Sequence, residues 1–93
     1  MIGGNSNEFL ESVYSGQDTV FIYKGIKYWC QGYVQDDGRS YMEVFQYQPA
    51  NEENAWSYIG ATAKECFHAF LEVPMFDGKT FWDAEQEIEW VDD

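Results

Sequence analysis

Two glycine-containing turns constrain the fold of this chain most, because they divide residues 19–47 into three strand-like segments. Lys24-Gly25 separates residues 19–23 from residues 26–34, and Asp37-Gly38 separates the second segment from residues 41–47. All three segments are rich in β-branched and aromatic residues, and glycine accepts the positive φ that tight turns need. Connections this short join neighbouring antiparallel strands, so the sequence predicts a β-meander. We expect a fourth strand at residues 55–61, after a polar loop at residues 49–54.

Two capping-box patterns predict a helix on each side of the meander. Asn5 with Glu8 begins a helix at residues 6–15, and Thr62 with Glu65 begins a second helix that Pro74 ends. Both helices carry apolar residues at positions i, i+1, i+4 and i+5, which form one face. These faces are Phe9, Leu10, Val13 and Tyr14 in the first helix, and Cys66, Phe67, Phe70 and Leu71 in the second.

The C-terminal segment permits two interpretations. Apolar residues at 81, 84, 88 and 91 predict a third helix over residues 80–91, with Thr80 and Asp83 at its start. Ile-Glu-Trp at residues 88–90 also alternates, as a short edge strand would. We therefore expect one α+β domain over residues 1–93. Its order is α-β-β-β-β-α-α, with about four antiparallel strands packed on two to three helices.

Alternate residues of the strands divide into two sets, since side chains along a strand point to opposite faces. One set is almost wholly apolar and is expected to face the helices. The other mixes aromatic and polar residues, including Lys27, Gln31 and Glu43, and is expected to lie outside. The apolar set is Val20, Ile22, Ile26, Tyr28, Cys30, Val34, Met42 and Val44, and the aromatic residues of the mixed set are Phe21, Tyr23, Trp29, Tyr33, Tyr41, Phe45 and Tyr47.

The mixed set provides the first candidate binding residues: Trp29, Tyr33, Tyr41 and Phe45. Tyrosine and tryptophan suit a half-wet surface, and an exposed aromatic sheet can bind another protein. The alternatives are a face covered by a helix or a second subunit, and a face that stacks nucleobases.

The net charge favours a protein partner over nucleic acid. Seventeen acidic residues against five basic ones give a formal net charge of −12. Such a chain repels phosphate backbones and anionic membranes, so we expect a basic protein partner, no direct nucleic-acid binding and no membrane binding. The first residues lack a basic segment followed by an apolar run, and no apolar stretch is long enough to span a bilayer, so we expect a cytoplasmic protein. Solubility alone is the other explanation of the charge.

The acidic C-terminal residues are the second set of candidates. In the helical interpretation, Glu85 and Glu89 lie one turn apart and repel each other, and a cationic partner would relieve that repulsion. A solvated acidic face that salt screens is the alternative. The candidates are Glu85, Glu87, Glu89, Asp92 and Asp93.

Catalytic and metal-binding patterns are absent from the sequence. Cys66 and His68 point away from each other on a helix, and two cysteines with one histidine are too few for a zinc site. No phosphate-binding glycine loop and no nucleophile elbow is found. We expect a non-enzyme with no cofactor and no metal.

The segments FIYKGIKYWCQGY and PMFDGKTFWDAEQEIEWVDD are similar to small uncharacterised proteins common in Firmicutes and their mobile elements. The resemblance implies no functional residue. In size and acidity the chain also resembles phage-encoded inhibitors of bacterial defence, including some anti-CRISPR proteins.

Two functions are therefore expected. The first is a non-enzymatic domain that engages a basic protein surface, whose narrowest form is an inhibitor that mimics nucleic acid. The alternative is a structural or regulatory interaction module of unknown function that uses the aromatic sheet face, with a homodimer as one form.

Overall fold

The structure is a computed structural model that describes residues 1–91, without the side chains of residues 51–54. Its elements are, in chain order, α1 (Ser6–Tyr14), β1 (Thr19–Tyr23), β2 (Ile26–Val34), β3 (Ser40–Gln48), β4 (Ala50–Gly60), α2 (Ala63–Glu72), α3 (Phe81–Ala84), the 3-10 turn η1 (Glu85–Glu87) and β5 (Ile88–Val91). This order confirms the predicted α+β class, with a fifth strand at the C-terminal end.

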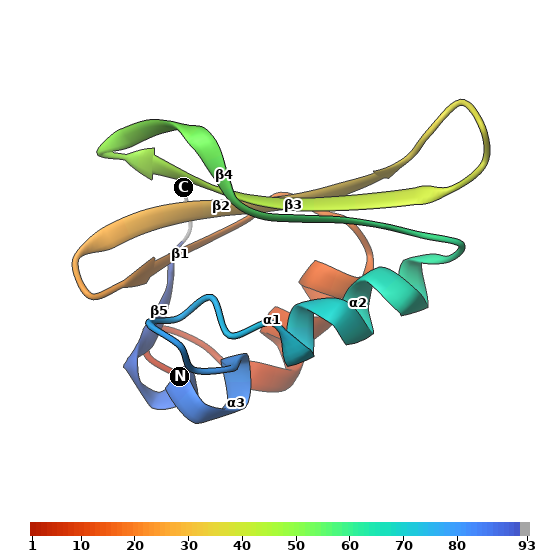
Figure 1. Cartoon of the computed structure of the whole chain (residues 1–93). Helices are drawn as coiled ribbons and strands as arrows, with labels where there is room; N and C mark the ends of the chain where they lie inside the picture. The colour runs from red at the N-terminus through yellow and green to blue at the C-terminus, as the bar shows by residue number, and fades with distance from the viewer. Residues whose placement is uncertain (92–93) are drawn as a thin grey trace.

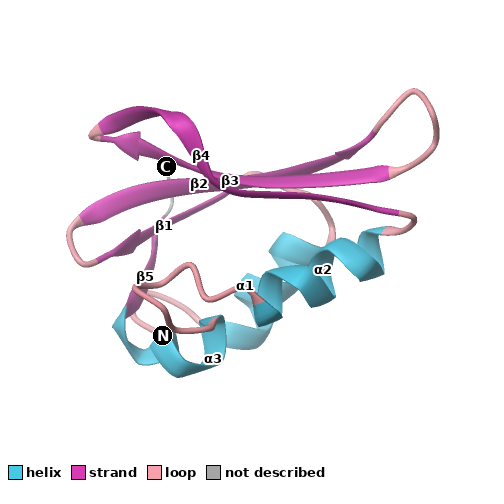
Figure 2. Ribbon diagram, in the orientation of Figure 1, coloured by secondary structure: helices cyan, strands magenta, loops and turns pink. Residues whose placement is uncertain are grey.

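The five strands form one antiparallel sheet in the order β4-β3-β2-β1-β5. The three helices all lie on one face of this sheet (Figure 1). Figure 2 shows the same two layers, with the helices below the strands and no helix above them in residues 1–91. We call the face without helices the outer face.

The predicted turns form as expected. Lys24 and Gly25 both have positive φ, 51° and 80°, which is the backbone geometry of a two-residue hairpin. Asp77 and Gly78 repeat this geometry with φ of 55° and 82°. The ammonium of Lys24 lies 2.7 Å from a carboxylate oxygen of Asp77, so an ion pair joins the two turns.

The prediction of faces is wrong for the first strand. In the β1–β2 hairpin Phe21 lies opposite Tyr28, and Tyr23 lies opposite Ile26. A two-residue turn pairs odd positions with even ones, so the parity of the inward residues changes across it. Phe21 and Tyr23 are therefore buried on the side of the helices. Val20 is also buried, but it lies on the outer face with Trp29, its partner across the hairpin. Ile22 lies outside with Val20, since alternate residues share a face.

Both predicted N-terminal caps are present. The side-chain oxygen of Asn5 accepts hydrogen bonds from the backbone N–H groups of Asn7 and Glu8, at 2.8 and 3.2 Å. The hydroxyl of Thr62 accepts from the N–H of Glu65 at 3.3 Å. These bonds satisfy amides that the first turn of a helix leaves without partners.

The polar loop predicted at residues 49–54 is instead the first part of β4, which begins at Ala50. A tight turn at Pro49 places Ala50 opposite Tyr47, and the pairing with β3 then continues with two register shifts. Polar residues with low strand propensity are held there by their backbone pairing, a tertiary effect that local composition does not reveal.

The predicted third helix is present but shorter than residues 80–91, and the edge-strand alternative is correct for residues 88–91. The helix ends at Ala84, and Ile88–Val91 forms β5. Ile88 lies opposite Tyr23, and Trp90 lies opposite Phe21. The hydroxyl of Thr80 donates to Asp83 at 3.1 Å and makes no cap bond to the backbone. Pairing with β1 satisfies the backbone of residues 88–91 and turns Ile88 and Trp90 toward the helices.

Phenylalanine is the commonest residue of the core. The ring of Phe9 stacks on Phe81 at 5.6 Å and meets the edges of Phe21 and Trp90 at 5.7 and 5.6 Å. Phe81 in turn lies 6.0 Å from Phe70 of α2. The core therefore joins α1, α2 and α3 to the central and C-terminal strands. Five fully buried phenylalanines contribute: Phe9, Phe21, Phe70, Phe76 and Phe81.

We expect the substitution Phe9→Leu to lower the free energy of unfolding by roughly 1–3 kcal/mol, because it removes three ring contacts from a fully buried site. Urea denaturation measures the change. Trp82→Leu is the control, since the side chain of Trp82 is 53% exposed and its replacement should cost no more than about 0.5 kcal/mol. Equal losses in the two variants would show that Phe9 has no central place in the core.

Candidate functional site

The outer aromatic face, which we define as Trp29, Tyr33, Tyr41, Phe45 and Tyr47, is the candidate site. These residues come from β2 and β3 and alternate with the core residues Cys30, Met42 and Val44. The structure thus confirms that all of the first candidate residues share the face that carries no helix (Figure 1).

The residues of this face form successive pairs of facing side chains on β2 and β3, which we call rungs. Tyr33 lies opposite Tyr41 with ring centroids 5.1 Å apart, and Trp29 stacks on Phe45 at 5.9 Å. Between these two aromatic rungs, Gln31 lies opposite Glu43. One carboxylate is therefore flanked on both sides by aromatic rings.

Neighbouring polar groups fix the position of Glu43. The amide of Gln31 donates to one carboxylate oxygen at 2.5 Å, and the hydroxyl of Tyr41 donates to the other at 3.1 Å. Partial burial, and secondarily the charge of Glu43, raises the pKa of Tyr41, so this hydroxyl remains a donor at neutral pH. The carboxylate is half-buried and held in one orientation.

The end of the face formed by Trp29 and Tyr47 already contacts a cation, the ammonium of Lys27. The ring of Tyr47 meets that of Trp29 edge-on at 5.5 Å, and the ammonium of Lys27 lies 5.7 Å from the centre of the Tyr47 ring. The indole N–H of Trp29 is buried and makes no hydrogen bond with the described residues. Tyr33, at the opposite end, is 54% exposed, and the other four rings are half-buried.

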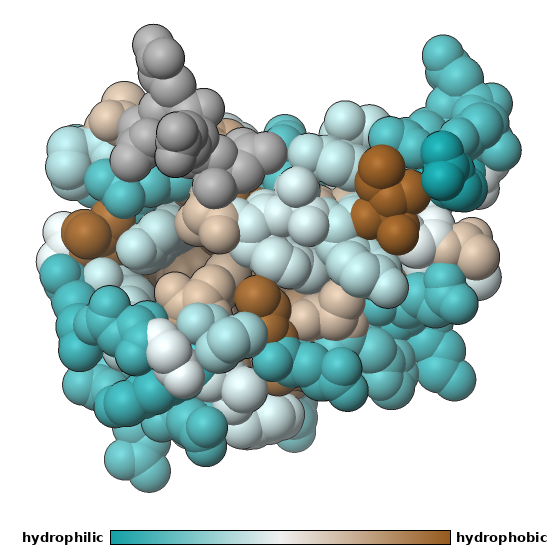
Figure 3. All heavy atoms as spheres, viewed as in Figure 1, coloured by the Kyte–Doolittle hydropathy of each residue, from teal (hydrophilic) through white to brown (hydrophobic). Residues whose placement is uncertain are grey.

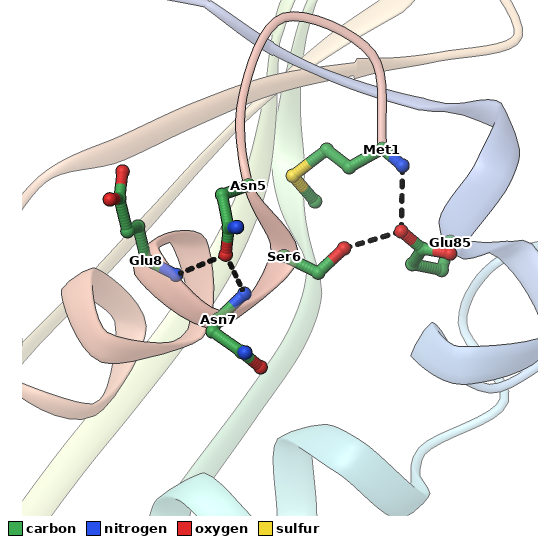
Figure 4. A network of polar contacts seen from close by, with 6 residues as sticks. All are labelled: Met1, Asn5, Ser6, Asn7, Glu8 and Glu85. Carbon is green, nitrogen blue, oxygen red and sulfur yellow. Dashed lines mark hydrogen bonds and ion pairs between the residues drawn. The ribbon is translucent and has the colours of Figure 1, made fainter.

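The second set of candidates does not form an acidic helix face. Glu85 lies in η1, where it accepts from the amine of Met1 at 2.6 Å and from the hydroxyl of Ser6 (Figure 4). Glu87 pairs with Lys79 at 3.5 Å. Glu89 lies in β5 opposite Ile22 of β1.

Glu85 therefore helps to hold the N-terminal segment, and the three glutamates have three different environments. Asp92 and Asp93, the remaining candidates of that set, lie outside the described residues.

The cysteines and the histidine are not gathered into a reactive group. Cys30 is buried, and its burial, with a smaller effect of Glu43, raises the pKa of the thiol to about 12. Cys66 is buried on the inner side of α2, whereas His68 is exposed on the same helix. In the described part of the chain, no three acidic, cysteine or histidine side chains are placed to hold a metal ion. None of the helices in residues 1–91 has the length and apolar character to cross a lipid bilayer.

Three site residues were not among the candidates predicted from the sequence: Tyr47 of the outer aromatic face, and the facing pair Glu43 and Gln31. The sequence did indicate the pairing of Gln31 with Glu43, since the Asp37-Gly38 turn sets the register that places these two residues opposite each other. The hydrogen bonds that orient the carboxylate depend on side-chain conformations, which a sequence pattern does not contain.

We expect Glu85→Gln to destabilise the fold at pH 7, and the difference from the unsubstituted protein to shrink as the pH falls to about 3. The Met1 amine and the Ser6 hydroxyl hold the pKa of Glu85 below its ordinary value. A lowered folded-state pKa stabilises the fold above the ordinary carboxyl pKa, and this contribution is lost as the pH falls through the lowered value.

Thermal unfolding at several pH values measures this difference. Glu87→Gln is the control and should change little, because both partners of its ion pair are about half exposed. A gap between Glu85→Gln and the unsubstituted protein that persists at pH 3 would contradict the role of the charge.

Comparison with models of known protein families, with curated proteins and with solved structures finds no match to this chain. Its function must therefore be inferred from the surface that the fold presents.

Proposed function

We propose that this protein is a non-enzymatic binding domain that engages a basic surface of a partner protein through the outer aromatic face. The observation that carries the proposal is the single carboxylate of Glu43 between two aromatic rungs, Tyr33–Tyr41 and Trp29–Phe45. A lysine or arginine side chain of the partner, placed over the Gln31–Glu43 pair, would contact the fixed carboxylate and the faces of the neighbouring rings at the same time.

Cation–π contact makes such a pairing favourable. A cation over an aromatic ring contributes about 0.5–1 kcal/mol at an exposed site and about 2 kcal/mol when water is excluded. The contact of Lys27 with Tyr47 shows that a ring on this face accepts an ammonium group. Tyrosine and tryptophan are also the residues most often found to dominate protein interfaces.

The net charge of −12 supports the same partner class. A strongly negative protein attracts a basic surface at long range and accelerates its association. It also repels phosphates, so the proposal excludes direct binding of nucleic acid to these rings. A nucleic-acid mimic is a narrower form that needs carboxylates spaced along one rigid face. The different environments of Glu85, Glu87 and Glu89 offer it no support, so we propose the broader function.

The substitution Tyr33→Ser tests the face. We expect it to weaken partner binding roughly 30-fold, which corresponds to the loss of about 2 kcal/mol at an interface hot spot. Tyr14→Ser is a matched control: Tyr14 is 44% exposed, its ring lies 5.3 Å from that of Phe67, and it belongs to α1 in the helical layer. The control should bind normally.

The measurement is quantitative capture of host proteins by the three immobilised proteins at ~50 and ~500 mM salt. We expect the unsubstituted protein and Tyr14→Ser to capture basic proteins at low salt. Tyr33→Ser should not capture them. Equal capture by Tyr33→Ser, or capture that salt does not weaken, would contradict the proposal. Sedimentation of the purified chain completes the test, since self-association that Tyr33→Ser abolishes would assign the face to a homodimer.

A further inference from the structure

The two edges of the sheet differ in how they are protected. At one edge β5 has only four residues, and the N-terminal segment covers it. The N–H of Ile2 donates to the carbonyl of Ile88 at 2.9 Å, and the N–H of Trp90 donates to the carbonyl of Ile2 at 2.8 Å. At the other edge β4 has eleven residues, and no segment within residues 1–91 pairs with its outer side. Alternate N–H and C=O groups of such an edge point away from the sheet.

The C-terminal half of β4 also lacks the usual features that keep an edge from pairing. Residues 55–60 read Ala-Trp-Ser-Tyr-Ile-Gly, with no charge and no proline. The pairing with β3 is regular from Gly60 to Trp56, and the register shifts lie beyond this stretch. Tyr58 and Ile59 are 40% and 45% exposed. An edge of this kind is a template for another strand.

A groove runs between this edge and α2. It is open to solvent, has a volume of about 640 Å³, and is lined on the strand side by Tyr58, Ile59 and Gly60. Lys64 and His68 line it on the helix side, one turn apart and both exposed. Figure 3 shows this side of the molecule, with residues of intermediate to high hydropathy along β4 and more hydrophilic residues around them.

The charge of the groove differs from that of the whole protein. Its lining contains two bases, Arg39 and Lys64, and two acids, Glu65 and Glu72, whereas the chain as a whole has five bases and seventeen acids. Glu65 is engaged by the N–H of Ala61 at 2.5 Å, and Arg39 pairs with Asp37. Lys64 has no ion-pair partner among the described side chains. Within the described part of the chain, Lys64 is therefore the cation of the groove that is available to a ligand.

We propose that this groove binds an extended segment of a partner protein, which pairs with residues 55–60 as a sixth strand and places an acidic side chain against Lys64. Strand addition beside a helix derives affinity from main-chain hydrogen bonds and selectivity from the side chains that enter the groove. The free ammonium of Lys64 favours a carboxylate there. A second copy of this chain is disfavoured as the occupant, because two chains of charge −12 repel each other.

Residues 55–60 pair with the strand that carries Tyr41 and Glu43, but Lys64 lies on α2, on the opposite side of the sheet from the outer aromatic face. Variants of Lys64 and of Tyr33 therefore test the two proposals separately. Lys64→Glu tests the groove. Lys79→Glu is the control, since it makes the same change of charge at an exposed lysine that does not line the groove. Tyr33→Ser serves as a second control, because it alters only the outer aromatic face.

The probe is a phage-displayed library of random twelve-residue peptides, selected on the unsubstituted protein. We expect enriched peptides that share an acidic residue and that bind Lys64→Glu at least tenfold more weakly. Lys79→Glu and Tyr33→Ser should bind them as the unsubstituted protein does. Hydrogen exchange of the backbone amides in residues 55–60 should slow when a selected peptide is bound.

Three results would overturn the proposal. One is the absence of enrichment over an unrelated target, and another is equal binding of the selected peptides to Lys64→Glu. The third is slowed exchange at residues 55–60 that depends on protein concentration without peptide, which would make a second copy the occupant of β4.

Discussion

The ring of Phe9 makes the contacts on which the rest of the structure depends. It touches Phe21 of β1, Phe81 of α3 and Trp90 of β5, and so it joins the first helix to segments at both ends of the chain. Because Trp90 packs on this ring, β5 lies beside β1 and residue 2 can pair with its free edge. The same packing gathers all three helices on one face, so no helix of residues 1–91 covers the outer face and no strand of those residues pairs with the outer side of β4.

The core and the outer aromatic face contain different kinds of aromatic residue, because phenylalanine has no polar atom whereas tyrosine and tryptophan have one. The five aromatic side chains that are fully buried are phenylalanines, which have no polar atom to satisfy. Four of the five rings of the outer aromatic face belong to tyrosine or tryptophan, whose polar tips suit contact with water or a partner. The high aromatic content of the chain thus serves two purposes, a compact core and a surface able to bind cations.

Turn chemistry made much of the sheet predictable. Glycine at positions 25, 38 and 78 adopts positive φ, and the bounds predicted for the first two strands agree with β1 and β2. The assignment of faces failed only where parity was carried across the Lys24-Gly25 turn. The C-terminal segment could not be decided locally, because residues 81, 84, 88 and 91 fit a helical period while residues 88–90 fit a strand period. Its pairing with β1, a contact across the whole chain, decides between them.

The candidate site was predictable in part for the same reason. The rings of β2 and β3 follow from simple alternation and a correct register, so Trp29, Tyr33, Tyr41 and Phe45 were identified. The acidic candidates depended on a helix over residues 80–91, which ends at Ala84, and Glu85, Glu87 and Glu89 lie in three different environments. The orientation of Glu43 was beyond prediction, because it results from hydrogen bonds between side chains on neighbouring strands.

The most direct measurement of binding at the outer aromatic face is a ¹H–¹⁵N NMR titration with a short arginine-rich peptide. The indole N–H groups of Trp29 and Trp82 report on the outer face and on the exposed side of α3 in one spectrum. We predict saturable shifts of the Trp29 indole and of the Tyr33 and Tyr41 amides, with little change at Trp82, and no shift of the Trp29 indole with a glutamate-rich peptide of equal length. Shifts spread over the whole acidic surface, or centred on Trp82 with Trp29 unchanged, would contradict the assignment of this face as the binding site.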